Sequence, residues 1–315
     1  MNKELVKGSQ ELVVFLHNDL DAAGCMLNIE YKWPQLKKKY FFTNYANIKE
    51  KVQEIKDYIF INKNTHILCA DVSFSDAPEE LKILTSLCKC TLIDHHMYTE
   101  GFWVDFPELK IVHDITSCAA ELCNEYLQNK GKNPNLDKLT KIIDIYDIWQ
   151  DQHSAFQVAQ DLNLYFWSYD LTLFVQNIIK NDYKLPKGYL EEVQKLKEQE
   201  AQAVKDFEKR KLIHRMGEIT LAFVDDHFNK ILIDEMEKGQ NFVIGISSYG
   251  IIKVRINAFC GYHEERLNKI RYELSGKAEF GHLCAFTFKI KNVSFDNLMK
   301  EAERIVKTIN HIIKG

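Results

Sequence analysis

Residues 11–24 read ELVVFLHNDLDAAG, and the interpretation of the first half of the chain depends on them. The opening run ELVVFL is almost continuously apolar, which is typical of a strand buried on both faces of a parallel sheet. Where that strand should end, one imidazole and two carboxylates follow at every second position, from His17, Asp19 and Asp21. A strand end rarely carries these three side chains for structural reasons alone, so we expect them to hold a ligand.

Short apolar runs alternate with helical patterns through the first half of the chain. Strands are predicted at 11–17, 38–45, 65–73 and 90–96. Helices are predicted at 22–34, 48–59, 77–89, 117–131 and 135–149. Because the strands are nearly continuously apolar, this alternation predicts an α/β fold with a parallel sheet that helices cover on both faces.

The second half begins with a highly charged segment. Residues 190–212 contain no Gly or Pro and place apolar residues at helical spacing, which predicts a connecting helix. Three alternating or β-branched runs follow, at 217–226, 241–259 and 282–291. A last helix is predicted at 294–314, with Ser294 as its N-cap. The expected parts are an N-terminal domain at 1–188, a connecting helix at 189–213 and a smaller α/β domain with a mixed sheet at 214–315.

The composition argues against several classes of function. The net charge is −4 and the pI is about 6.3, so the chain has no basic surplus for neutralising the phosphates of a long duplex. No stretch approaches the ~18 apolar residues of a membrane-spanning helix, and the first residues lack the apolar core of a signal peptide. The eight cysteines are scattered without a CxxC pair, which favours reduced thiols over a zinc site. We expect a cytoplasmic protein that binds neither membranes nor long duplexes.

Acids and histidines gather at four places in the first half, three of which are predicted strand ends. The groups are His17 with Asp19 and Asp21; Asp71; Asp94 with His95 and His96; and Asp144 with Asp147. Ligands of open α/β sheets bind outside the carboxyl ends of the strands, so we expect these side chains to meet there. Carboxylate and imidazole donors without thiolates suit Mn²⁺ best, with Mg²⁺, Fe²⁺, Co²⁺ or Zn²⁺ as alternatives. A carboxylate shared by two ions about 3.5–4 Å apart would form the clamp used in phosphoryl displacement.

Each group also has a purely structural interpretation. A lone aspartate after a strand, such as Asp71, is most often a turn or cap residue, and Asp19 or Asp21 could cap the helix that follows. The adjacent histidines could be one core residue and one surface residue, and the acids of the fourth group could face solvent. Four such groups in succession along one alternating pattern favour a shared metal site over four separate structural roles.

These motifs resemble those of the DHH phosphoesterase superfamily, named for the tripeptide found here as Asp94-His95-His96. HNDLDAAG is similar to its first motif, Asp71 to its second, IDHH to its third and DIYDIW to its fourth. The resemblance covers nearly the whole chain and implies an N-terminal DHH domain followed by a DHHA1-like substrate-binding domain. The H-x-D-x-D opening and the D-x-W ending are most similar to the NrnB-type oligoribonucleases, or nanoRNases.

The resemblance implies two Mn²⁺ ions, with Mg²⁺ or Co²⁺ as alternatives. One ion would be held by His17, Asp19 and Asp71. The other would be held by Asp21, Asp71, His95 and Asp147, with Asp144 as the alternative to Asp147. Asp94 would fix the tautomer of a histidine, and His96 would contact the scissile phosphate or orient a ligand. In the C-terminal domain, the substrate would be gripped by Arg255, Gly281 and His282.

The activity that the resemblance implies is hydrolysis of short oligonucleotides, from dinucleotides to mononucleotides in the 3′–5′ direction, by a water activated between two metal ions. The same site would suit a cyclic dinucleotide, 3′-phosphoadenosine 5′-phosphate, pyrophosphate or polyphosphate. A non-catalytic nucleotide sensor is a further alternative, although every ligand position is occupied here. The chain is also a candidate homodimer.

Overall fold

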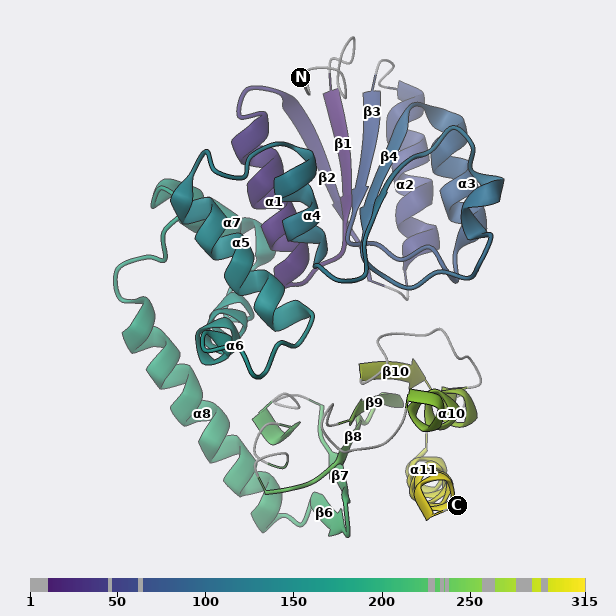
Figure 1. The fold of residues 1–315 in the computed structure, drawn as a ribbon. Helices are drawn as coiled ribbons and strands as arrows, with labels where there is room; N and C mark the ends of the chain where they lie inside the picture. Colours follow the sequence, from purple (N-terminus) through teal and green to yellow (C-terminus); the bar gives the residue numbers. More distant parts are fainter. Residues whose placement is uncertain are drawn as a thin grey trace. The chain divides into compact units, whose positions relative to one another are not determined.

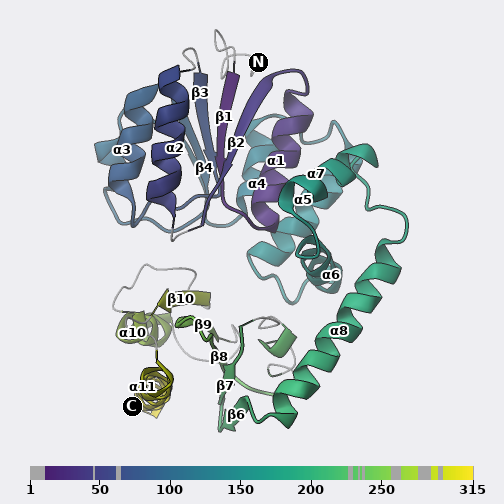
Figure 2. The same ribbon diagram turned by 180° about the vertical axis from the view of Figure 1, so that it is seen from behind.

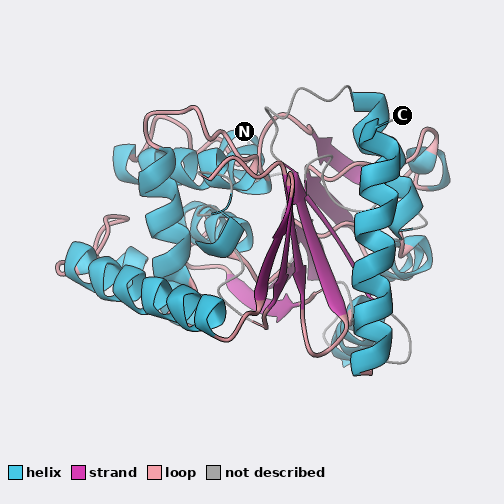
Figure 3. Ribbon diagram, turned by 90° about the horizontal axis from the view of Figure 1, so that it is seen from below, coloured by secondary structure: helices cyan, strands magenta, loops and turns pink. Residues whose placement is uncertain are grey.

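Two five-stranded sheets organise the part of the chain that the structure describes. This computed structural model of the 315 residues describes residues 11–44, 47–61, 65–225, 230–232, 235, 238–256, 264–275, 285–289 and 294–314. The chain divides into two units, Met1–Val193 and Gln194–Gly315, and each is described by itself. Figure 3 shows the helices and strands of both units. Among the described residues, no helix combines the length and apolarity needed to cross a bilayer.

The first sheet is parallel throughout, as the sequence predicts. Its strands are β1 (Glu11–Leu16), β2 (Lys37–Phe42), β3 (Thr65–Ala70), β4 (Cys90–Asp94) and β5 (Lys110–His113). They lie in the order β2-β1-β3-β4-β5, so that Leu16 at the end of β1 pairs with Phe42 on one side and with Ala70 on the other. Figure 1 shows β1 to β4 side by side. Every strand therefore has its carboxyl end at the same edge of the sheet.

Helices cover both faces of this sheet, which confirms the second part of the prediction. The helices of this unit are α1 (Leu20–Lys32), α2 (Ile48–Ile61), α3 (Pro78–Leu87), α4 (Ala119–Tyr126), α5 (Pro134–Asp147), α6 (Phe156–Phe166) and α7 (Leu171–Lys180), with the 3₁₀ helix η2 (Phe102–Asp105). Of these, α5 packs against α1 and α4, α6 packs against α5, and α7 packs against α1. Figures 1 and 2 show α1 and α4 on one face and α2 and α3 on the other. Along β1, Leu12, Val14 and Leu16 pack on the α1 side, whereas Val13 and Phe15 pack on the α2 side. Burial on both faces explains why the strand is a continuous apolar run.

The direction of winding changes between β1 and β3. The chain leaves β1 into α1 on one face, and it leaves β3 into α3 on the other. At such a switch point the two connections diverge, and the carboxyl ends of the strands are where α/β sheets bind their ligands. These two strand ends are followed by His17 and Asp71, which the sequence pattern assigns to metal binding.

The second unit contains a mixed sheet with helices, which confirms the predicted fold class. The remaining elements are α8 (Tyr189–Lys209), β6 (Ile213–Met216), β7 (Ile219–Phe223), β8 (Phe242–Ile246), β9 (Ile251–Ile256), α10 (Glu264–Ser275), β10 (Ala285–Lys289) and α11 (Phe295–Lys314). In the order β10-β9-β8-β7-β6, β7 and β8 are parallel and the other pairs are antiparallel. Ile252, Val254 and Ile256 of β9 pack into one core with residues of α10 and α11. α11 is the long helix that reaches the C-terminus in Figure 3.

Gly24 allows α1 to lie close to its neighbouring helices in the first unit. A Cβ atom at this position would lie 2.6 Å from Cβ of Ala120 and 2.9 Å from Cδ1 of Ile143. These two side chains belong to α4 and α5, so the glycine lies where three helices meet. Gly24 is inside α1, and the requirement is therefore for space rather than for an unusual backbone conformation.

We expect Gly24→Ala to destabilise the protein by about 1–3 kcal/mol, because overpacking outweighs the roughly 1 kcal/mol by which a helix prefers alanine to glycine. Ala120→Gly should cost less in the Gly24→Ala background than in the wild type, since it removes the nearest clash. Urea unfolding of the wild type, both single variants and the double variant measures this coupling. A Gly24→Ala variant as stable as the wild type would contradict the packing that we describe.

Candidate metal centre

Four segments bring donor side chains to the carboxyl edge of the first sheet. They are the residues that follow β1, the residue that follows β3, the end of β4 with the two residues after it, and the end of α5. The side chains that they carry are His17, Asp19, Asp21, Asp71, Asp94, His95, His96 and Asp147. Because parallel strands end at one edge, these residues meet although they are far apart in the sequence.

Most of these side chains form three overlapping groups, in each of which the donor atoms lie within 4.8 Å of one another. The groups are His17 with Asp19 and Asp71; Asp71 with His95 and His96; and Asp21 with His95 and Asp147. Asp71 and His95 each belong to two groups. The donors therefore form one continuous cluster, and Asp71 lies where a bridging carboxylate would be needed.

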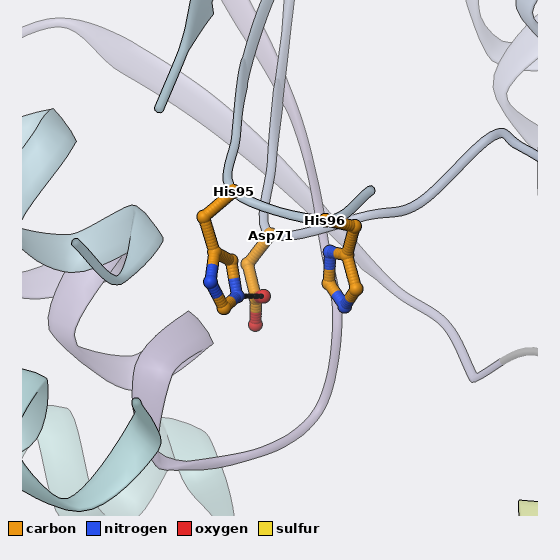
Figure 4. A group of neighbouring side chains, drawn as sticks. All are labelled: Asp71, His95 and His96. Atoms are coloured by element: carbon orange, nitrogen blue, oxygen red, sulfur yellow. Dashed lines mark ion pairs between the residues drawn. The ribbon is translucent and has the colours of Figure 1, made fainter. Parts of the chain in front are cut away.

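The spacing around His95 is close to that of donors that share a cation. Its Nε2 lies 3.4 Å from Oδ2 of Asp147 and 3.5 Å from Oδ1 of Asp71. Oδ2 of Asp21 is slightly farther away, at 3.8 Å. These separations exceed the roughly 2.9 Å of a hydrogen bond. Two donors about 2.1 Å from one ion, about 90–110° apart around it, would be about 3.0–3.4 Å from each other. Figure 4 shows the imidazole of His95 facing the carboxylate of Asp71.

The acids of the cluster are buried beside one another. Asp21 and Asp71 are only 1% and 3% exposed. Burial raises the pKa of Asp71 well above its ordinary value, and the carboxylates of Asp19 and Asp21 raise this pKa further. Burial also raises the pKa of Asp147 to about 7, and the charge of Asp19 adds to the effect. A divalent cation among these carboxylates would offset their repulsion and favour the ionised forms.

Two carboxylate oxygens in the cluster are available to such a cation. Oδ2 of Asp71 and Oδ2 of Asp147 are buried and accept no hydrogen bond from the described residues. Buried polar atoms of native proteins are nearly always hydrogen-bonded, so oxygens of this kind indicate a partner that binds there. Oxygen and imidazole donors are those that Mn²⁺, Mg²⁺ and Zn²⁺ accept. The residues present therefore fit a divalent metal centre.

Asp19 has a structural role as well. Its Oδ1 accepts the amide hydrogen of Ala22 over 3.1 Å, so that Asp19 caps α1, and its Oδ2 lies 2.8 Å from Nδ1 of His17. Burial would raise the pKa of Asp19, but the charge and the hydrogen bond of His17 outweigh burial and lower this pKa below its usual range. The helix cap that we weighed as an alternative is therefore present, and it holds Asp19 within the group that includes Asp71.

Two buried acids hold the first turn of α4. Oδ1 and Oδ2 of Asp21 accept the amide hydrogens of Ala120 and Ala119, each over 2.8 Å. Oδ1 of Asp144 accepts the amide hydrogen of Cys118 over 2.9 Å. These carboxylates satisfy amides that a helix N-terminus leaves unpaired, and they face the positive end of its dipole. Asp21 therefore ties α4 to the donor cluster.

Asp144 differs from Asp147 in what its side chain contacts. The second oxygen of Asp144, Oδ2, accepts hydrogen bonds from Lys141 and Gln150 over 2.6 and 3.3 Å. None of the three donor groups among the described residues includes Asp144, whereas Asp147 faces His95. Asp144, the alternative ligand from the fourth motif, therefore contacts the start of α4 and two side chains near the end of α5.

Asp147 occupies an unfavourable place for an acid, the last residue of α5. A carboxylate near a helix C-terminus interacts unfavourably with the helix dipole. The helix ends in a Schellman motif, in which the amide of Gln150 donates to the carbonyl of Ile145 over 2.9 Å. Trp149 fills the left-handed position of this motif with a φ of 55°, where glycine is normally preferred. Asp147 and Trp149 are thus both placed against local preference at this helix end.

Asp94 and His96 form a pair beside the donor groups. Asp94 is fully buried at the end of β4, and its Oδ1 lies 2.8 Å from Nδ1 of His96. Burial would raise the pKa of Asp94, but the charge of His96 lowers this pKa to about 2. Burial would lower the pKa of His96, but Asp94 raises it to about 9. Because Nδ1 of His96 contacts Asp94, Nε2 is the ring nitrogen through which His96 would bind a metal ion or a substrate.

Two residues that support this pair were not predicted from the sequence. The hydroxyl of Tyr98 donates to Oδ2 of Asp94 over 2.5 Å, and Nε2 of His113 lies 2.6 Å from the carbonyl oxygen of His96. Tyr98 ends the run DHHMY, and its position close to Asp94 in the sequence is the feature that indicates a contact between the two side chains. His113 ends β5, a strand that was not predicted, and its own sequence neighbourhood contains no comparable motif.

The predicted substrate residues lie in the second unit. Arg255 is half-buried on β9, where it alternates with the core residues Val254 and Ile256. Gly281 and His282 lie outside the residues that the structure describes. The substrate-binding role of all three stays a prediction.

The chain is similar in fold to solved structures of RecJ. No protein-family model matches the chain, and no curated protein matches it. RecJ from Thermus thermophilus, in complex with Mn²⁺, is similar with a TM-score of 0.64 and 13% identity, over 98% of this chain and 53% of that one. Exonuclease RecJ bound to manganese is similar with a TM-score of 0.57 and 14% identity, over 97% of this chain and 92% of that one. The chain thus spans about half the length of the Thermus protein. At these identities the likeness shows the fold alone, which is similar to that of RecJ.

Asp71→Asn should separate metal binding from folding. Asparagine tolerates the left-handed backbone at this position, where φ is 55°, and the change removes one negative charge. Without metal, we expect the variant to be at least as stable as the wild type, because it removes a carboxyl group whose burial among other acids costs free energy, either through repulsion or through the proton that its raised pKa makes it bind. With Mn²⁺, the Tm of the wild type should rise and that of the variant should change much less. Calorimetric scans with and without Mn²⁺ measure both effects.

Asp182→Asn is the matched control. Asp182 is exposed, has a φ of 54° and lies outside the donor groups. This variant should respond to Mn²⁺ as the wild type does. An equal rise in Tm for Asp71→Asn would show that the cation binds elsewhere.

Proposed function

We propose that this chain is a metal-dependent phosphodiesterase that hydrolyses short oligonucleotides and converts dinucleotides to mononucleotides in the 3′–5′ direction. The observation that carries the proposal is the cluster of carboxylates and imidazoles around Asp71 at the carboxyl edge of the parallel sheet. Clusters of this kind bind pairs of divalent cations for phosphoryl displacement. The similar fold of an exonuclease bound to manganese supports the same chemistry.

Two Mn²⁺ ions are the cofactors that we propose. One would be held by His17, Asp19 and Asp71. The other would be held by Asp71, His95, Asp147 and Asp21. When bound, the ions would polarise phosphoryl oxygens and lower the pKa of a coordinated water, so that a nucleophile is available at neutral pH.

The chain's own groups prepare the site for this chemistry. The cap contact of Asp19 with α1 and the contacts of Asp21 with α4 hold these two side chains in place. The carboxylates are therefore already ordered before a metal ion binds. His96 would contact a phosphoryl oxygen of the substrate through Nε2, since Asp94 holds Nδ1. Asp94 would thus orient the imidazole toward the phosphate.

Short substrates are proposed because the chain has no excess of positive charge. Proteins that bind long nucleic acids rely on many Lys and Arg contacts with successive phosphates. The net charge of −4 disfavours such an extended interaction. A dinucleotide contains a single phosphodiester, and its binding depends mainly on the metal centre and on a few nearby groups.

Removal of metal tests the chemistry. After treatment with a chelator, the protein should not hydrolyse a labelled dinucleotide, and added Mn²⁺ should restore turnover. Asp71→Asn should show no measurable turnover with Mn²⁺, whereas Asp182→Asn should match the wild type. Activity that survives the chelator would contradict the proposal as a whole.

A panel of substrates tests the specificity. Rates on di-, tetra- and longer oligoribonucleotides should fall with length, and end-labelled substrates should report release from the 3′ end. Cyclic dinucleotides, 3′-phosphoadenosine 5′-phosphate, pyrophosphate and polyphosphate complete the panel. Faster turnover of any of these would refute the oligonucleotide substrate while leaving the metal chemistry in place.

A further inference from the structure

A tyrosine hydroxyl joins two of the loops that carry the metal-centre residues. The hydroxyl of Tyr98 donates to Oδ2 of Asp94 over 2.5 Å. The same hydroxyl oxygen accepts the amide hydrogen of Phe74 over 3.2 Å. Phe74 belongs to the loop after β3 that begins with Asp71, and Tyr98 belongs to the segment after β4 that contains His96. One oxygen atom therefore connects both loops.

Packing fixes the ring that carries this hydroxyl. The ring centroid of Tyr98 lies 4.3 Å from that of Trp103, 4.7 Å from that of Phe102 and 5.5 Å from that of His113. His113 also contacts the carbonyl oxygen of His96. This aromatic cluster holds the hydroxyl at Asp94, and a tyrosine loses little side-chain entropy in being held.

Asp94 depends on this hydroxyl for one of its two oxygens. The carboxylate is fully buried, with Oδ1 at Nδ1 of His96 and Oδ2 at the hydroxyl of Tyr98. Loss of the hydroxyl would remove the donor that holds Oδ2, and the carboxylate would gain freedom to rotate about its Cβ–Cγ bond. Rotation would move Oδ1 of Asp94 away from Nδ1 of His96. The imidazole would then no longer be held in one orientation, and neither would its Nε2 atom.

We propose that Tyr98 is a positioning residue of the metal centre, which fixes the imidazole of His96 through Asp94. In the line from Tyr98 to Asp94 to His96, the hydroxyl orients the carboxylate and the carboxylate orients the imidazole. Partners of this kind behind a metal site commonly change metal affinity or activity by about 10–100-fold when they are removed. The effect on turnover rests on the proposed function, whereas the effect on His96 does not.

Tyr98→Phe is the variant that tests this role, because it removes the hydroxyl and keeps the ring within the aromatic cluster. Tyr40→Phe is the matched control. Tyr40 is also half-buried and also donates to a carboxylate, Oε1 of Glu30, over 2.6 Å, but it belongs to none of the donor groups. The two variants lose the same atom and the same kind of hydrogen bond.

The direct measurement is proton NMR of the metal-free protein. An imidazole N–H held by a buried carboxylate exchanges slowly and resonates far downfield, and the resonance of His96 is assigned by its loss in His96→Gln. We expect this resonance in the wild type and in Tyr40→Phe, and we expect it to be broadened or lost in Tyr98→Phe. A resonance with the same position and width in Tyr98→Phe would overturn the proposal.

The catalytic measurement separates kcat from KM for a labelled dinucleotide with Mn²⁺. Tyr98→Phe should lower kcat about 10-fold or more and change KM by less than about 2-fold, while Tyr40→Phe should change neither. Since Tyr98 acts through Asp94, the double variant Asp94→Asn/Tyr98→Phe should be no slower than Asp94→Asn. An unchanged kcat in Tyr98→Phe would overturn the proposal. A wild type that turns over no dinucleotide would refute the proposed function, and the NMR comparison would then decide the role of Tyr98.

Discussion

Carboxylates buried side by side repel one another, and the first unit is arranged around that constraint. The fold compensates part of the charge. Amides at the start of α4 bind Asp21, and the imidazole of His17 contacts Asp19. Asp71 and Asp147 each keep a buried oxygen that accepts no hydrogen bond within the described ranges. A divalent cation would supply the positive charge that is still missing, and the strand order, the helix caps and the donor spacing together fit the binding of one.

Much of the first unit could be predicted because burial on both faces leaves a clear pattern in the sequence. The runs that form β1, β3 and β4 are apolar at most positions and buried throughout. The edge strands β5 and β6 lack this pattern and were not predicted. Each has four residues and is half-buried or exposed, so neither periodicity nor hydrophobicity distinguishes it from a loop.

The meeting of the donors could be predicted from strand ends, but the contacts of single residues could not. Asp144 and Asp147 are three positions apart on α5 and therefore only about 60° apart around the helix. Packing against α4 decides that Asp144 binds the amide of Cys118 while Asp147 faces His95. The amides that bind Asp21 lie 98 and 99 positions farther along the chain. Such contacts depend on how helices pack, and a local sequence pattern contains no information on that.

Backbone strain and charge repulsion coincide at the metal centre. Asp71 has a left-handed backbone with a φ of 55°, which costs an ordinary residue about 1–2 kcal/mol, and its carboxylate is the one most surrounded by other acids. Asparagine would remove the charge repulsion, and glycine would remove both the repulsion and the backbone strain. Stability alone therefore gives no reason for an aspartate at this position. A cation that binds the folded cluster and not the unfolded chain raises the free energy of unfolding as its concentration rises above its dissociation constant. Binding of a cation to this cluster would therefore be coupled to folding of the unit.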